Sequence, residues 1–301
     1  MITVCMRIAA LALVLAFGCA GIASAQPAPD AAALRARHES LRASLANSPF
    51  RRPLVLESVQ TPDELRGDVY AVVEQPFSVT GAALRGSADW CEVLILHLNV
   101  KHCSAAGQGP REVLSLVVGR KVEQALADAH RVDFAYSVPA AGPDYLRVQM
   151  TAADGPLYTH DYRLALEAMP LDAHTSFIHL SYAYAYGTAA RMAMQAYLAT
   201  AGRGKVGFSV IDKAADGKPV YIAGVRGVVE RNAMRYFLAV EAYLGATSAP
   251  PAERSEKRLR DWHAATERSP QQLHELELDE YLVMKRHELQ RQRAGAAAGL
   301  K

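Results

Sequence analysis

The stretch Phe177-Ile-His-Leu-Ser-Tyr-Ala-Tyr-Ala-Tyr186 decides the fold that this sequence predicts. Successive side chains of a β-strand point to opposite faces, so every second residue of the stretch shares a face. Two aliphatic residues, Ile178 and Leu180, mark the face that is buried in the core. The register of the strand then places three tyrosines on that same face, namely Tyr182, Tyr184 and Tyr186.

The same alternation occurs in several stretches upstream. Residues 130–138, 145–150 and 161–168 each carry an apolar residue at every second position, and turn-rich segments separate them. A series of alternating strands divided by short turns is typical of an antiparallel sheet. Two more tyrosines, Tyr136 and Tyr162, fall on the inward faces of these strands.

Two helices are predicted after the tyrosine-bearing strand. The first begins at Thr188. The second, residues 225–244, has a broad apolar stripe that includes Tyr236, while Glu230 and Arg235 belong to the opposite, charged face. We expect the apolar stripe of this second helix to lie on the sheet.

The chain ends in a charged tail, residues 247–301. Ser269-Pro270-Gln271-Gln272 is a helix-start signal, because it combines a capping residue, a proline in the first turn and a capping-box glutamine. Two interpretations stay open for this helical tail. It is either an arm that binds a protein partner or a solvated helical pair that packs on the domain.

The first 25 residues have the pattern of a secretory signal peptide. Arg7 precedes a short apolar run, residues 8–17, and Ala23-Ser24-Ala25 forms a cleavage site before Gln26. The apolar run is too short to span a bilayer as a helix. We therefore expect a mature protein that is periplasmic or secreted.

The cysteines and histidines predict no metal centre. Cys91 and Cys103 remain after cleavage, and an oxidising compartment allows either a disulfide between them or two buried thiols. His97, His102 and Cys103 lie close together in the sequence, but their spacing matches no zinc pattern. We expect neither a metal nor a cofactor.

Charge and motifs exclude two further classes of function. The formal net charge is +2, whereas nucleic-acid binding normally requires a strongly basic surface. Gly202-Arg203-Gly204-Lys205-Val206-Gly207 has the letters of a dinucleotide fingerprint, but a helix precedes it and a strand follows, which is the wrong order. The sequence has neither a G-x-S-x-G elbow nor an H-E-x-x-H motif, and its motifs do not indicate an enzyme.

The inward tyrosines admit two interpretations. A buried tyrosine hydroxyl needs a hydrogen-bond partner, and a small dry core rarely provides partners for several. A cavity that holds water or a ligand provides them readily. The alternative is a closed core in which the hydroxyls reach the rim of the sheet. We favour the cavity.

The order of these elements over residues 54–244 resembles the START-like helix-grip superfamily (SRPBCC). The resemblance rests on Gly67-Asp68-Val69-Tyr70-Ala71-Val72-Val73, on Pro76-Phe77-Ser78-Val79 and on Asp89-Trp90-Cys91, followed by the hairpins and the amphipathic helix. The whole chain is also similar to uncharacterised exported proteobacterial proteins. The resemblance implies an α+β fold in which a curved antiparallel sheet grips a long amphipathic helix around a hydrophobic cavity, here with a helical C-terminal extension.

We divide the chain into a signal peptide (1–25), an N-terminal helix (26–49), a START-like helix-grip domain (50–246) and the tail (247–301). The superfamily includes lipid carriers, cyclases and subunits of ring-hydroxylating enzymes, so the fold alone does not choose a function. We expect binding or transport of an apolar small molecule or lipid, with transient membrane contact. The alternatives are an enzyme of the same fold acting on a hydrophobic substrate and a non-catalytic envelope interaction module.

Four of the expected ligand-binding residues follow from the inward strand faces, and three more are added from their neighbourhood. Tyr136, Tyr182, Tyr184 and Tyr186 line the cavity, Trp90 lies near its mouth, and His97 and Arg131 are further candidates. No catalytic residue is assigned.

Overall fold

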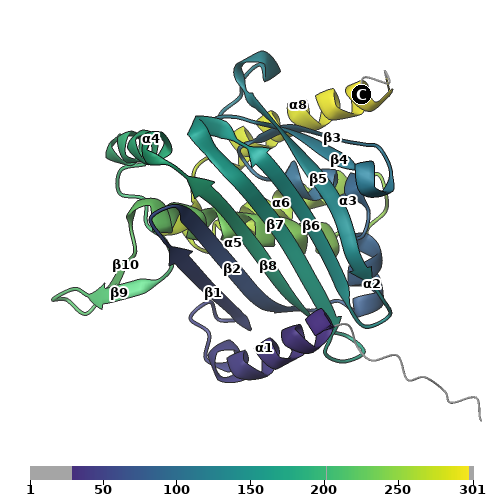
Figure 1. Ribbon diagram of the computed structural model, residues 1–301, viewed down its shortest axis with the longest axis horizontal. Helices are drawn as coiled ribbons and strands as arrows, with labels where there is room; N and C mark the ends of the chain where they lie inside the picture. The colour runs from purple at the N-terminus through teal and green to yellow at the C-terminus, as the bar shows by residue number, and fades with distance from the viewer. Residues whose placement is uncertain (1–28, 201, 298–301) are drawn as a thin grey trace, which may run out of the picture.

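The computed structural model describes residues 29–200 and 202–297, and the predicted signal peptide lies outside the described residues. An eight-stranded antiparallel sheet forms the centre of the molecule, and helices cover both of its faces (Figure 1). The helices are α1 (Pro29–Ala46), α2 (Phe77–Ala83), α3 (Ser87–Leu94), α4 (Thr188–Ala199), α5 (Gly224–Gly245), α6 (Arg254–Thr266), α7 (Pro270–Leu273) and α8 (Leu278–Ala297). The sheet strands are β1 (Leu54–Gln60), β2 (Glu64–Val73), β3 (Val100–Ala106), β4 (Val113–Val118), β5 (His130–Ala141), β6 (Leu146–Asp154), β7 (Thr159–Pro170) and β8 (Ser176–Tyr186).

The strands are ordered β1-β2-β8-β7-β6-β5-β4-β3. The predicted tyrosine strand, β8, lies between β2 and β7, and Leu180 is paired with Val69 on one side and Leu166 on the other. β1 is an edge strand that the sequence analysis did not predict, because its alternation is interrupted by Glu57 and Ser58 at half-buried positions. A separate hairpin, β9 (Val210–Lys213) and β10 (Pro219–Tyr221), precedes α5.

The long helix α5 crosses the inner face of the sheet. Its closest approach is to β2, where a Cβ on Gly67 would lie 2.9 Å from the Ala233 Cβ and 3.2 Å from the Val229 carbonyl oxygen. A glycine at this position therefore sets how deeply α5 can sit. The arrangement confirms the predicted fold class, an α+β helix-grip fold with a helical C-terminal extension.

The sequence predicted a charged face of α5 opposite its apolar stripe, but charged residues of that face are buried. Glu230, Arg231 and Arg235 are each exposed by 2 % or less. Glu230 accepts hydrogen bonds from the backbone N–H groups of Phe208 and Ser209, and Arg235 pairs with Glu275 at 2.8 Å. The loop before β9 and the C-terminal extension supply these partners, and Ser58 of β1 also donates to Glu230 at 2.5 Å, so all three pack against α5.

The C-terminal extension packs on the domain through a buried core of its own. Trp262 of α6 stacks on Tyr281 of α8, with ring centroids 5.0 Å apart. Lys285 donates to the carbonyls of His97 and Val100, at 2.7 and 2.9 Å, and pairs with Glu288. The extension thus packs on the domain, as the second interpretation predicted, but through a buried core and not as a solvated pair.

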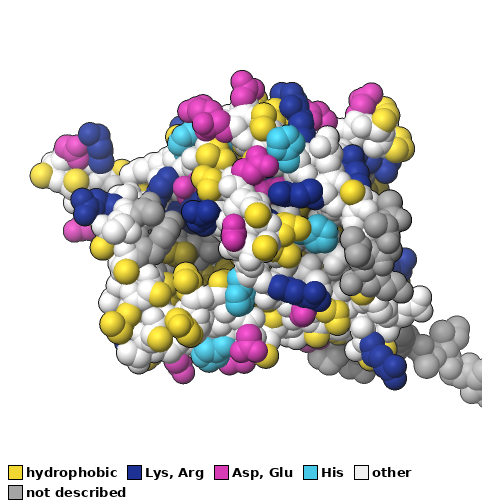
Figure 2. All heavy atoms as spheres, turned by 90° about the horizontal axis from the view of Figure 1, so that it is seen from above, with side chains coloured by type: hydrophobic (Ala, Val, Ile, Leu, Met, Phe, Trp, Pro, Cys, Tyr) yellow, Lys and Arg dark blue, Asp and Glu magenta, His cyan; other side chains and the backbone are white. Residues whose placement is uncertain are grey.

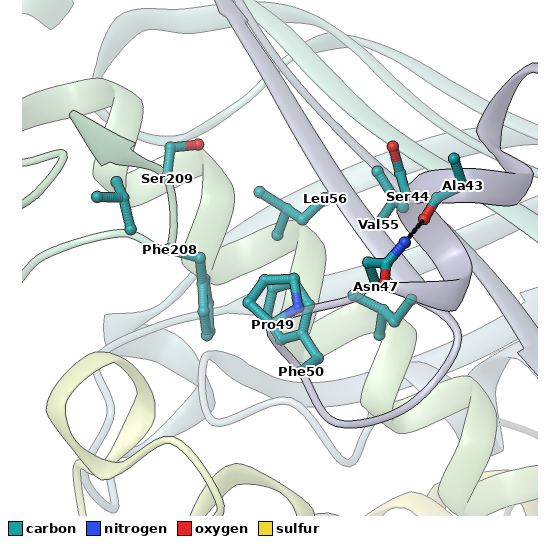
Figure 3. Close-up of a pocket in the computed structure, with 11 residues that line it drawn as sticks. Ala43, Ser44, Asn47, Pro49, Phe50, Val55, Leu56, Phe208 and Ser209 are labelled. Atoms are coloured by element: carbon teal, nitrogen blue, oxygen red, sulfur yellow. Dashed lines mark hydrogen bonds between the residues drawn. The ribbon is translucent and has the colours of Figure 1, made fainter. Parts of the chain in front are cut away.

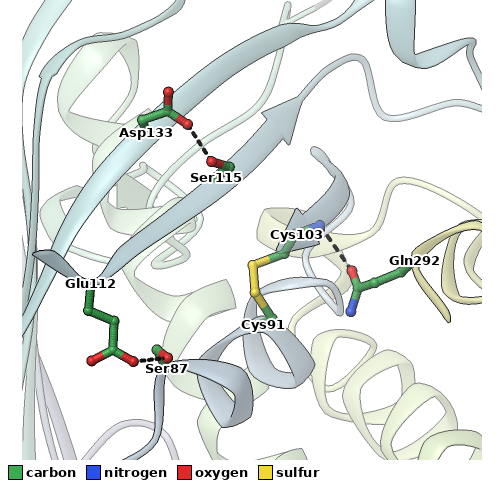
Figure 4. The surroundings of a disulfide bond; sticks show 7 residues. All are labelled: Ser87, Cys91, Cys103, Glu112, Ser115, Asp133 and Gln292. Carbon is green, nitrogen blue, oxygen red and sulfur yellow. Dashed lines mark hydrogen bonds between the residues drawn. A yellow bond between two sulfur atoms is a disulfide. The ribbon is translucent and has the colours of Figure 1, made fainter. Parts of the chain in front are cut away.

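A disulfide joins α3 to β3 (Figure 4). Cys91 and Cys103, with Cα atoms 5.2 Å apart, form the bridge, which decides between the two states left open by the sequence. Gln292 of α8 accepts a hydrogen bond from the Cys103 backbone N–H at 2.9 Å. Because β3 is an edge strand, this contact covers one of its unpaired backbone donors.

Helix α1 lies on the outer face of the sheet. His38 of α1 meets Phe177 edge-on, with ring centroids 4.8 Å apart. Close by, His179 bridges Asp68 and Glu167 at 3.0 Å each. Burial opposes protonation of His179, but hydrogen bonds and charge attraction from the two carboxylates outweigh it and raise the His179 pKa.

We expect Gly67→Ala to lower the free energy of unfolding by about 1–3 kcal/mol, the usual cost of overpacking. The added methyl meets the rigid Ala233 side chain, which cannot move aside without displacing α5. The matched control is Gly245→Ala, where nothing lies within 4 Å of the new Cβ. Urea unfolding of both variants checks this, and equal midpoints would contradict the close approach.

Candidate functional site

A continuous series of aromatic rings lies between the inner face of the sheet and α5. Tyr182 is 5.1 Å from Tyr236 of α5, and Tyr236 stacks on His97 at 4.6 Å. In the other direction Tyr182 is 5.7 Å from Tyr184, which stacks on Tyr162 at 5.2 Å. We call these five residues the aromatic series.

Separate elements bring the aromatic series together. β8 contributes Tyr182 and Tyr184, which share a face because they are two residues apart, and the adjacent strand β7 contributes Tyr162. His97 comes from the turn that links α3 to β3, and the disulfide ties these two elements together.

The tyrosine hydroxyls of the aromatic series are neutral at physiological pH. Burial raises the pKa of Tyr182, Tyr184 and Tyr236 above the ordinary value. Tyr184 donates to the Met194 Sδ of α4 over 3.8 Å, and the Tyr162 hydroxyl is 2.6 Å from the Thr159 hydroxyl. The hydroxyls can therefore act as hydrogen-bond groups, but not as anions.

His97 has an unsatisfied buried donor. Its ring is 2 % exposed, and its Nδ1 accepts the Asn99 backbone N–H at 3.1 Å. That bond assigns the ring proton to Nε2, which has no hydrogen-bond partner among the described residues. Burial, followed by repulsion from Arg235 and Lys285, holds the His97 pKa well below its usual value, so the ring is neutral. A buried donor without a partner is costly unless another molecule satisfies it.

Two rings of the aromatic series retain accessible surface. Tyr162 and Tyr236 are only partly buried, yet burial is the largest influence that raises the pKa of each. The exposed parts of these two rings are apolar surface that another molecule can contact. A small apolar molecule could cover that surface and accept the His97 Nε2 proton in a hydrogen bond.

The other predicted ligand-binding residues lie outside the aromatic series. Tyr136 and Tyr186 are on the inner face, but their hydroxyls donate to the carbonyls of Arg85 and Thr61, at 2.9 and 2.8 Å. The hydroxyls of Tyr136 and Tyr186 therefore bind backbone carbonyls, as expected for the alternative of a closed core in which tyrosine hydroxyls reach the rim of the sheet.

Trp90 and Arg131 also have local roles. Trp90 is fully buried, and its Nε1 donates to the Leu84 carbonyl at 2.8 Å, so it is a core anchor. Arg131 alternates with the buried Val132, lies on the outer face and pairs with Asp133. We do not retain either residue in the site.

Tyr162 and Tyr236 were not among the predicted site residues. Tyr162 was placed on an inward face and Tyr236 in the apolar stripe of the helix, but the sequence did not show that the two would meet. The position of Tyr236 did contain a signal for this contact. A tyrosine in the middle of the apolar stripe of a helix needs a hydrogen-bond partner on the sheet or on the segments that face the helix.

A pocket of about 540 Å³ lies beside the edge strand β1, away from the aromatic series (Figure 3). Phe50 and Phe208 face each other there, with ring centroids 5.5 Å apart. Two of its polar side chains have internal partners, since Asn47 donates to the Ala43 carbonyl and Ser209 to Glu230. No unsatisfied donor points to a ligand in this pocket.

The described residues contain neither a metal-ion cluster nor a membrane-spanning helix. They contain no cluster of three or more side chains suited to a metal ion, and none of their helices is long and apolar enough to cross a membrane. On the face in Figure 2, basic and acidic side chains are interspersed, in keeping with the small net charge.

No protein-family model and no curated protein matches this chain. Solved structures give partial likenesses at 12 % identity each. They are norcoclaurine synthase from Thalictrum flavum (TM-score 0.34; 48 % of this chain, 89 % of that chain), Zhui aromatase/cyclase from Streptomyces sp. R1128 (0.30; 69 % and 94 %) and Ara h 8.0201 (0.36; 61 % and 99 %). At these TM-scores the likenesses do not define the fold, which rests on the strand order and the packing of α5.

The buried His97 and the half-buried His179 should give opposite pH dependences. The His97 pKa is lowered in the folded state, so its protonation in the unfolded state destabilises the protein as pH falls below about 6.5. The His179 pKa is raised, so its contribution is fully present below about 6.5 and is lost as pH rises through the folded value.

We expect the stability difference between wild type and His97→Asn to shrink from pH 7.5 to 5.5 by up to about 1.4 kcal/mol per pH unit. The difference for His179→Asn should grow over the same interval. Denaturant unfolding at each pH measures both. Parallel profiles for the two variants would show that the assigned protonation states are incorrect.

Proposed function

We propose that this protein binds a small apolar molecule between the inner face of its sheet and α5. The observation that carries the proposal is the unpartnered Nε2–H of His97 beside the partly exposed ring of Tyr236. A ligand with an aromatic or aliphatic body and one acceptor atom satisfies both features at once. Burial of its apolar surface would supply most of the binding energy, at roughly 25 cal/mol per Å².

The protonation states favour binding over acid–base catalysis. His97 is neutral, and its Nδ1, the nitrogen that could accept a proton, is occupied by the Asn99 N–H. The tyrosine pKa values are raised, which makes these hydroxyls poor acids and poor general bases near neutral pH. The aromatic series can thus orient a ligand without changing it.

We further propose that the chain is a START-like helix-grip protein that works outside the cytoplasm, in the periplasm or after secretion. The order of strands and helices and the grip of α5 support the first point. The leader pattern of residues 1–25 and the Cys91–Cys103 disulfide support the second, because disulfides persist in oxidising compartments. An exported carrier of this kind would exchange its ligand through transient contact with a membrane.

Binding of the neutral fluorescent probe N-phenyl-1-naphthylamine tests the site. We expect one probe per protein, and at least tenfold weaker binding to Tyr236→Trp, because the larger ring occupies the surface left open beside His97. The control is Tyr145→Phe, which removes a hydrogen bond from the Tyr145 hydroxyl to Glu167 on the outer face of the sheet. This variant should bind the probe like wild type. Equal probe affinity in all three proteins, with equal unfolding midpoints, would place the probe elsewhere.

A further inference from the structure

Another pocket, of about 610 Å³, lies at the end of the sheet where α4 meets the start of α5. Its walls come from the β1–β2 turn, from Tyr186 at the end of β8, from α4 and from the first turn of α5. Tyr186, Ile222 and Val225 give it an apolar floor, and two arginines, Arg191 and Arg226, stand in its lining.

The two arginines of this pocket form no direct ion pair with the described residues, and the nearest linked carboxylate is Glu230, which accepts from the Ser58 hydroxyl at 2.5 Å. Arg191 donates to the Pro62 carbonyl and lies over the Tyr186 ring at 5.6 Å. Arg226 donates through Nε to the Ser58 hydroxyl at 2.7 Å. Neither guanidinium has an ion-pair partner among the described residues, and no acidic side chain lines the pocket. Arginine forks bind carboxylates well, so the lining complements an anionic group.

The pocket adjoins the aromatic series. Tyr184 and Tyr186 are two residues apart on β8, so both face inward. Tyr186 lines the pocket, and Tyr184 belongs to the aromatic series. Helix α4 lies over this step, with Ala190 and Met194 buried and the Tyr184 hydroxyl against the Met194 sulfur. The hydroxyl-to-sulfur contact of 3.8 Å is weak, so a ligand beneath α4 could replace it while the other contacts of the helix stay in place.

We infer that the ligand is an amphipathic acid, whose carboxylate binds Arg191 and Arg226 while its apolar body passes under α4 to the aromatic series, where a second acceptor atom at its far end meets the His97 Nε2 proton. The inference rests on the proposed function and names its ligand class. Two separate observations support this ligand class. The pocket supplies two guanidinium groups that form no direct ion pair with the described residues, and the aromatic series supplies partly exposed rings. The two are joined along one strand, β8.

Displacement of N-phenyl-1-naphthylamine by dodecanoate and by 1-dodecanol at pH 7.5 tests this inference. The two ligands share their chain length and differ in the anionic group. We expect wild type to bind dodecanoate at least tenfold more tightly than dodecanol. The double variant Arg191→Gln/Arg226→Gln should lose at least tenfold for dodecanoate and less than twofold for dodecanol. Arg260→Gln/Arg268→Gln, with the same change of net charge at exposed positions of the extension, should behave like wild type.

The outcomes separate the two claims. If wild type binds both ligands equally, or if the double variant loses both to the same extent, the carboxylate assignment is overturned while an apolar site remains. If neither the probe nor either ligand binds, the proposed function itself fails and this inference fails with it.

Discussion

The structure depends on burying helix α5 on both of its sides. On the sheet side, Gly67 lets the helix backbone come within contact distance of β2. Elsewhere on the helix, Glu230 and Arg235 are almost fully buried, and a buried charge is tolerated only when it is paired or hydrogen-bonded. The loop before β9 and the C-terminal extension meet that requirement. The extension is therefore part of the fold that holds the helix, and not an appendage.

The same constraint positions the candidate site. Tyr236 projects from α5 onto Tyr182 of β8, so the distance between helix and sheet sets the space at the aromatic series. The backbone of His97 is held in place by two contacts. Lys285 of the extension donates to the His97 carbonyl oxygen, and the disulfide joins α3 and β3, which flank the turn that carries His97. The ring that carries the unpartnered donor is thus held rigidly, as a ligand-orienting group should be.

The sequence predicted the parts of the fold that have strong local periodicity. The alternation in 177–186 placed Tyr182 and Tyr184 correctly on the inner face, and the 3.6-residue stripe found α5. It could not predict that the charged face of α5 is buried, because burial depends on segments far along the chain, such as Glu275. The pairing of His97 with Tyr236 was likewise invisible, since contacts between a turn and a distant helix leave no periodic signal. Arg131 was misplaced as a candidate because the side of the strand that it occupies faces outward.

Native mass spectrometry of the protein purified from its export compartment, followed by organic extraction, tests the central claim most directly. We predict a co-purifying mass of a small apolar molecule that extraction removes, and loss of that mass in Tyr236→Trp isolated in parallel. A wild-type protein that is free of any bound molecule and also fails to take up N-phenyl-1-naphthylamine would contradict a ligand site between the sheet and α5.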